Sequence, residues 1–134
     1  MSSASVPPSA RLSTVVLDAR DAHELAHFYA RLLNYAVRAE ESHWVLIGPP
    51  DGAAGTALAF ETEPEYVPPV WPTRKAGDQQ MMLHLDVEVD DLEAGTARAV
   101  AEGATLADDQ PQDDVRVLLD PSGHPFCLWV RGAQ

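Results

Sequence analysis

Residues 81–91 read MMLHLDVEVDD, and this stretch decides the fold. Apolar and polar side chains alternate through 83–89, which is the period of a β-strand with one buried face and one polar face. Asp91 then supplies a residue type that caps the N-terminus of a helix. The stretch therefore predicts a strand over 81–89 that leads directly into a helix over 92–102.

The same order of elements occurs earlier in the chain. Setting Asp21 over Asp91 gives an offset of 91 − 21 = 70 residues. Residues 11–18 alternate as a strand, and 25–33 carry an apolar stripe of helical period. Three strand-like runs follow each helix, at 36–39, 44–47 and 57–61 in the first half and at Thr105, 115–119 and 126–130 in the second. Strand, helix and three strands thus occur twice, which is typical of a duplicated half-domain.

We expect an α+β protein with a single folded domain over 11–134. Its first module spans 11–62 and its second module spans 81–131. A proline-rich segment over 63–80, here called the bridge, connects them in an extended form. Residues 1–10 are rich in Ser, Pro and Ala and are expected to form a flexible tail.

Charge and cysteine content narrow the choice of partner. The 134 residues carry 9 Lys and Arg against 21 Asp and Glu, a net charge of −12. Such a field repels phosphate backbones and anionic lipid, so we expect neither a nucleic-acid nor a membrane partner. Cys127 is the only cysteine and cannot form an internal disulfide, and no secretory signal is evident. A cytoplasmic location is therefore expected.

Four segments resemble the vicinal oxygen chelate superfamily, which includes glyoxalase I, extradiol dioxygenases, fosfomycin resistance enzymes and bleomycin resistance proteins. They are VLD at 16–18 leading to HFY at 27–29, HLDVEVDD at 84–91, EGA at 102–104 and LDPSGHPF at 119–126. The chain is most similar to the small glyoxalase-like subgroup. The resemblance implies tandem βαβββ modules that form an open curved barrel, the glyoxalase/bleomycin resistance/dioxygenase fold, around an internal cleft. It also implies a homodimer, as in many relatives.

The resemblance further implies where a divalent metal would bind. In metal-using members, the first strand of each module supplies a His or Gln and the last strand a Glu. His84 matches, whereas Thr14 stands at the equivalent position of the first module. Cys127 stands at one Glu position, and Ala59 at the other, with Glu61 two residues further on. A metal would rest on His84, Glu61 and Cys127, but two of the four positions hold other residue types, so we favour an interpretation without metal.

Two functions follow from the resemblance, and both involve a small organic molecule in the cleft. The first is a lyase or isomerase of glyoxalase type, in which His84 acts as general acid or base and Glu61 supports it. The second is a binding protein that sequesters a drug or metabolite without catalysis. The acidic charge favours a cationic ligand. Neighbouring carboxylates disfavour a thiolate, so a nucleophilic role for Cys127 is not expected.

Large aromatic side chains are further candidates for the cleft walls. Trp71 lies among prolines in the bridge, where a loop can cover a cleft. His124 lies in a turn, where a surface position is favoured, and the spacing of His23, His27 and His43 suggests no cluster. The predicted ligand-binding residues are Thr14, Trp44, Phe60, Trp71, Asp86, Cys127 and Trp129.

Overall fold

A computed structural model describes residues 8–131. Residues 8–10 are exposed and form neither helix nor strand, while the rest of the predicted tail, 1–7, and the last residues, 132–134, lie outside the described part. Within that part, no helix is long and apolar enough to cross a membrane.

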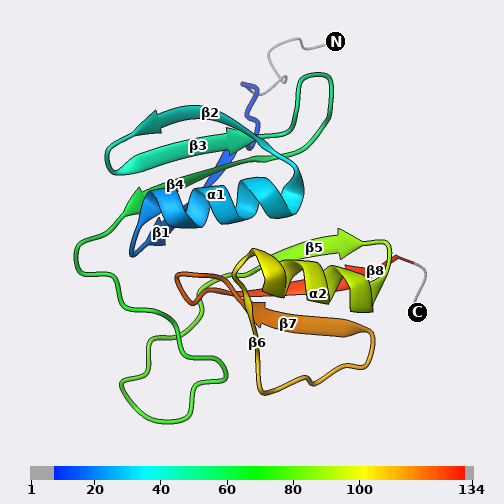
Figure 1. Ribbon diagram of the computed structural model, residues 1–134. Helices are drawn as coiled ribbons and strands as arrows, with labels where there is room; N and C mark the ends of the chain where they lie inside the picture. Colours follow the sequence, from blue (N-terminus) through cyan, green and yellow to red (C-terminus); the bar gives the residue numbers. More distant parts are fainter. Residues whose placement is uncertain (1–7, 132–134) are drawn as a thin grey trace, which may run out of the picture.

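The first module forms a four-stranded mixed sheet covered by one helix (Figure 1). Its elements are β1 (Thr14–Ala19), α1 (Ala22–Leu33), β2 (Ala36–Glu41), β3 (Trp44–Gly48) and β4 (Ala57–Thr62). The strand order is β1-β4-β3-β2, with β1 parallel to β4 and the other neighbours antiparallel. We call this the first sheet.

The second module repeats this architecture. Its elements are β5 (Leu85–Val89), α2 (Leu92–Glu102), β6 (Thr105–Leu106), β7 (Val115–Leu119) and β8 (Pro125–Val130). The strand order of this second sheet is β5-β8-β7-β6, with β5 parallel to β8. The predicted α+β class and the two βαβββ modules are confirmed, and the described strands form two separate sheets rather than a closed barrel.

Asp21 and Asp91 cap the two helices, as predicted. The Asp21 carboxylate accepts hydrogen bonds from the backbone N–H groups of His23 and Glu24, and Asp91 accepts one from Ala94. These bonds satisfy amides that have no partner inside the helix. The local sequence therefore sets both helix starts.

The strand predicted over 81–89 is shorter than expected, because β5 begins only at Leu85. Leu85 pairs with Phe126 on β8, so His84 would pair with Pro125. Proline has no backbone N–H to donate, and the ladder ends there. His84 consequently lies just before the strand, next to the polar face of the second sheet.

Both modules contribute to one hydrophobic core. Phe28 and Tyr29 on α1 contact Phe126 on β8 edge to face, with ring centroids 5.9 Å apart in each pair, and all three side chains are buried. Each sheet therefore turns its apolar face toward this shared core. Its polar face points away from the core, so the two polar faces do not meet within one chain.

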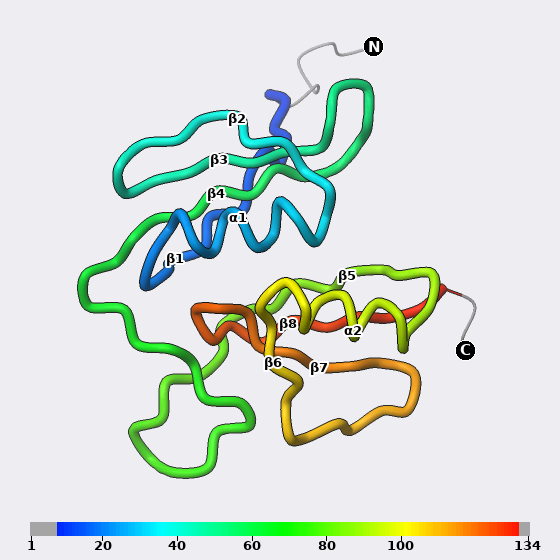
Figure 2. Tube along the Cα trace, in the orientation of Figure 1, coloured from blue at the N-terminus to red at the C-terminus, as the bar shows by residue number. Residues whose placement is uncertain are grey.

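The bridge, 63–80, runs from the first sheet to the second without helix or strand (Figure 2). This agrees with its proline content, since proline cannot donate to a backbone ladder. The bridge thus connects the two modules as an irregular segment, which can form the wall of a pocket.

Candidate functional site

Four of the predicted site residues lie together on the polar face of the second sheet. Asp86 on β5 is paired with Cys127 on β8, and Trp129 is two residues further along that strand. His84 Nε2 lies 3.1 Å from Asp86 Oδ1. A pocket of about 250 Å³ opens here, lined by these four side chains and by Gln112 and Asp114, and we call it the His84 pocket.

The chemistry of the His84 pocket is that of an imidazole next to a carboxylate. Asp86 can orient the imidazole of His84 toward the pocket, and an oriented imidazole suits proton transfer. Burial raises the pKa of the Cys127 thiol, and Asp86 raises it further. Both effects disfavour the thiolate form of Cys127.

Arg131 contacts two residues of the second sheet, Glu88 on β5 and Trp129 on β8. Its guanidinium donates two hydrogen bonds to the Glu88 carboxylate, at 2.7 and 2.8 Å, and lies 5.6 Å from the ring centroid of Trp129. The hydrogen bond from Arg131 lowers the pKa of Glu88. The two hydrogen bonds thus hold the Glu88 carboxylate against Arg131.

The predicted residues of the first module lie on the other sheet. Glu61 on β4 is paired with Asp18 on β1 and with Trp44 on β3, and Thr14 lies on the same face of β1. The ligand atoms of His84, Asp86 and Cys127 lie within 4.8 Å of one another, and Glu61 does not belong to this described group.

Phe60 lies on the opposite face of β4, in the core. It is fully buried and stacks on Tyr29 with ring centroids 5.8 Å apart. Its partners in the register are Leu17 and Val45, which are also buried. Phe60 therefore supports the helix rather than lining a cleft.

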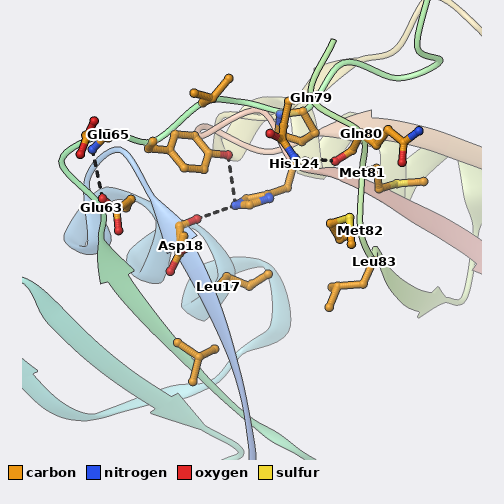
Figure 3. A pocket seen from close by; sticks show the side chains of 14 residues that line it. Leu17, Asp18, Glu63, Glu65, Gln79, Gln80, Met81, Met82, Leu83 and His124 are labelled. Atoms are coloured by element: carbon orange, nitrogen blue, oxygen red, sulfur yellow. Dashed lines mark hydrogen bonds between the residues drawn. The ribbon is translucent and has the colours of Figure 1, made fainter. Parts of the chain in front are cut away.

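A larger pocket of about 400 Å³ lies between β1, the bridge and the turn before β8 (Figure 3). We call it the bridge pocket. Its apolar lining comes mainly from Val16, Leu17, Val67, Pro69, Met81 and Met82, and its acidic lining from Asp18, Glu63 and Glu65. Among the described lining residues there is no Lys or Arg. The bridge thus forms a pocket wall as expected, but Trp71 is outside the lining.

His124 lines the bridge pocket, although its place in a turn suggested a surface residue. Its Nε2–H donates to the Asp18 carbonyl at 2.6 Å, and the Tyr66 hydroxyl lies 3.3 Å from the same nitrogen. The Tyr66 hydroxyl donates to the Ser122 carbonyl at 2.8 Å. No local signal identifies these contacts, because they join residues 56 to 106 positions apart.

Residues 14–129 match the family model described as a glyoxalase-like domain. The chain belongs to the glyoxalase-like family. The match covers both modules and the bridge, and it agrees with the vicinal oxygen chelate superfamily that the four sequence segments indicated. A search of curated proteins finds no match.

Solved structures of this glyoxalase-like fold are similar in architecture and distant in sequence. A glyoxalase/bleomycin resistance protein/dioxygenase family enzyme from Burkholderia phytofirmans PsJN is 18% identical, with a TM-score of 0.67 over 90% of this chain and 98% of that chain. A glyoxalase-related enzyme from Fulvimarina pelagi is also 18% identical, with a TM-score of 0.62 over 90% and 88%. An antibiotic binding protein from a Streptomyces species is 18% identical, with a TM-score of 0.59 over 91% and 96%. These likenesses concern the fold.

The donor set of this glyoxalase-like chain does not match a metal site shared between the two modules. Val16 pairs with Ala59 in the first sheet as Asp86 pairs with Cys127 in the second, so Ala59 is the equivalent of Cys127. Ala59 has no ligand atom, and Thr14 offers only a neutral hydroxyl. These residues therefore do not fit a metal ion held jointly by the two modules.

Proposed function

We propose that this glyoxalase-like protein binds a small, largely apolar, positively charged organic molecule in the bridge pocket. The observation that carries this proposal is the lining of that pocket, in which apolar walls stand beside Asp18, Glu63 and Glu65 without a described Lys or Arg. Apolar walls supply affinity, and the carboxylates select a cation. The net charge of −12 attracts the same class of ligand from a distance.

A binding role also agrees with the chemistry of the chain. The first module lacks metal donors at the two positions where metal-using relatives have them. The antibiotic binding protein from Streptomyces has a similar fold, which supports a binding role for this architecture. Sequestration of a drug or metabolite is therefore the function we infer.

Calorimetric titration with a panel of cationic aromatic compounds and their neutral isosteres tests the proposal. We expect the cations to bind more tightly, and Asp18→Asn and Glu63→Gln each to weaken cation binding up to about fivefold, the value of a solvent-accessible ion pair. Glu93→Gln, on the exposed first turn of α2, is the matched control. Equal affinity for cations and isosteres, or equal effects of all three substitutions, would contradict the proposal.

A second candidate function rests on the His84 pocket. The 3.1 Å contact between His84 and Asp86 provides an acid–base pair at an open pocket, as an isomerase or lyase needs. NMR can follow exchange of deuterium into small carbonyl compounds at the carbon next to the carbonyl. Under this hypothesis the protein accelerates exchange, His84→Ala abolishes the acceleration, and His43→Ala keeps it. Without acceleration by the wild type, the catalytic hypothesis fails.

We also propose that the protein forms a homodimer, as the family resemblance implies. Val16, Met82 and Leu83 are 53%, 83% and 52% exposed, which is unusual for large apolar side chains beside one pocket. A second copy that covers them would also shield the polar faces that one chain leaves open. Light scattering should give the dimer mass for the wild type and the monomer mass for Met82→Asp; a monomeric wild type would contradict this.

A further inference from the structure

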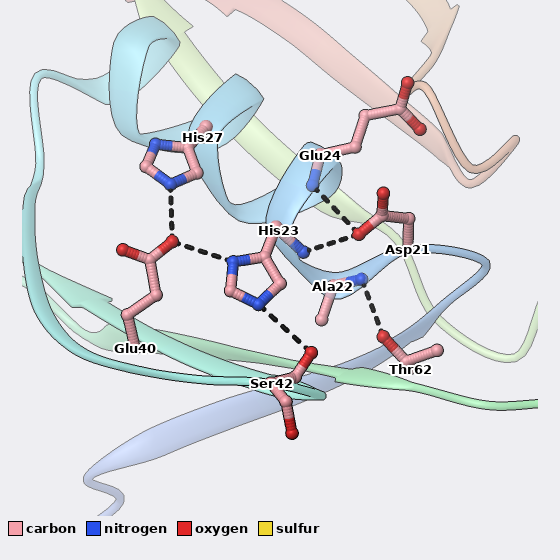
Figure 4. Close-up of polar contacts among 8 residues, drawn as sticks. All are labelled: Asp21, Ala22, His23, Glu24, His27, Glu40, Ser42 and Thr62. Carbon is pink, nitrogen blue, oxygen red and sulfur yellow. Dashed lines mark hydrogen bonds and ion pairs between the residues drawn. The ribbon is translucent and has the colours of Figure 1, made fainter.

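Two histidines and a glutamate of the first module, His23, His27 and Glu40, converge on one another (Figure 4). None of the three lines the bridge pocket or the His84 pocket. His23 and His27 lie four residues apart on α1, so their side chains share a face of the helix. The prediction that their spacing suggests no cluster was wrong, because it did not take this helical spacing into account. Glu40 reaches them from β2. One carboxylate oxygen, Oε2, lies 2.8 Å from His23 Nδ1 and 2.8 Å from His27 Nε2.

We propose that His23 Nδ1, His27 Nε2 and the Glu40 carboxylate bind one divalent cation of the Zn²⁺ class. The three ligand atoms lie within 4.8 Å of one another, close enough for small shifts to bring them around one ion. Two imidazoles and one carboxylate form a donor set that zinc accepts, with water in the fourth position. The cation takes a lone pair from each ring nitrogen: an imidazolium gives its proton to solvent, whereas a neutral ring moves its proton to the other ring nitrogen.

The surroundings of His23 fit a ligand role. Its other ring nitrogen, Nε2, lies 3.1 Å from the backbone carbonyl of Ser42. A hydrogen bond from Nε2–H to that carbonyl fixes the tautomer that leaves Nδ1 free to coordinate, as backbone carbonyls commonly do for metal-bound histidines. The turn between β2 and β3 therefore orients His23 toward Glu40.

The backbone around these side chains is well anchored. Asp21 caps α1, and the backbone N–H of Ala22 donates to the Thr62 hydroxyl at 2.9 Å, which ties the helix start to β4. Such anchoring reduces the loss of freedom on metal binding. The side chains of His23, His27 and Glu40 are 37%, 44% and 39% exposed, so an ion can reach them.

Without a cation, the same three groups form a proton-linked cluster. The hydrogen bond to Glu40 raises the pKa of His23, and the hydrogen bonds with His27 and His23 lower the pKa of Glu40. These hydrogen bonds hold the three side chains together in the free protein. A cation competes with protons for the nitrogen lone pairs, so metal binding releases a proton from each imidazole that is protonated, and the affinity should fall as the pH falls.

The test is calorimetric titration of the full chain, stripped with chelator, with Zn²⁺ in two buffers of different ionisation enthalpy, together with visible spectroscopy of the Co²⁺ form. We expect one cation per chain, proton release, and a tetrahedral Co²⁺ spectrum with nitrogen and oxygen ligands. His27→Ala and Glu40→Gln should weaken binding by more than about 100-fold, since loss of a group that only orients a ligand already weakens it about 10- to 100-fold.

Two matched controls separate this site from other histidines. His43→Ala removes an exposed histidine from the adjacent turn, and His84→Ala removes the histidine of the His84 pocket. Both should bind Zn²⁺ as the wild type does. Circular dichroism tests whether each variant is folded. If His27→Ala is not folded, His27→Gln takes its place. No stoichiometric binding, unchanged affinity in the His27 and Glu40 variants, or loss of binding only in His84→Ala would overturn the proposal.

Discussion

Asp120 joins the two modules through a single buried carboxylate. It follows β7, is only 4% exposed, and accepts hydrogen bonds from the Tyr29 hydroxyl at 2.8 Å and from the backbone N–H groups of Ser122 and His124 at 3.0 and 2.9 Å. Burial raises the pKa of Asp120 because it disfavours the charged form. The carboxylate depends on these donors, one of which comes from α1 of the other module.

Removing the Tyr29 hydroxyl should leave one Asp120 oxygen buried without that donor. We expect Tyr29→Phe to lower the free energy of unfolding by about 1–3 kcal/mol, measured by urea denaturation. Tyr35→Phe is the control, because the Tyr35 hydroxyl donates to the Thr56 carbonyl in an exposed position. Its effect should stay within about 0.5 kcal/mol. Equal effects of the two substitutions would contradict the role assigned to Asp120.

At the scale of elements, helices were easier to predict than strands. Helix α1 spans Ala22–Leu33 because Asp21 caps it locally and its apolar stripe packs on the first sheet. The apolar stripe of α2 is weaker, since Ala99 is its only buried residue. The Asp91 cap and Gly103 nevertheless set the bounds of this helix. The start of β5 could not be predicted, since it depends on the register against Pro125 on a distant strand.

The contact between α1 and β2 should stabilise the fold over a limited pH range. Because the hydrogen bond to Glu40 raises the pKa of His23 in the folded protein, this group contributes its full stabilisation of the fold below pH 6.5. The contribution is lost as the pH rises through the pKa that His23 has in the folded protein. Because the hydrogen bonds with His27 and His23 lower the pKa of Glu40 in the folded protein, Glu40 contributes its full stabilisation of the fold above pH 4.5. The contribution is lost as the pH falls through the pKa that Glu40 has in the folded protein. With chelator present, the difference in Tm between wild type and Glu40→Gln should therefore be largest between these two values. A difference that is independent of pH would contradict this assignment.

At the scale of the whole molecule, the shared core predicts that both modules unfold together. Phe126 on β8 is fully buried against Phe28 and Tyr29 on α1, so each module completes the core of the other. Scanning calorimetry of the wild type should show one transition, with equal calorimetric and van't Hoff enthalpies. Two separate transitions would contradict the prediction that 11–134 is one domain.

A core substitution should destabilise both modules at once. We expect Phe126→Ala to lower the free energy of unfolding by about 3–5 kcal/mol, a large share of the stability of a domain of this size. Chemical denaturation followed by far-ultraviolet circular dichroism measures the change. Leu106→Ala, at a 45% exposed position on the same sheet, should have a much smaller effect. A comparable loss in both variants would contradict the shared core.

The order of elements, the two helices and the four side chains on the polar face of the second sheet could be predicted from local sequence patterns alone. Caps and periodicities act between residues close in the chain, so they can be recognised without coordinates. Only the tertiary structure decided that Glu40 lies beside His23 and His27, that His124 contacts Asp18, and that Phe60 belongs to the core. Those positions depend on strand register and on the packing of distant segments, which no local pattern encodes.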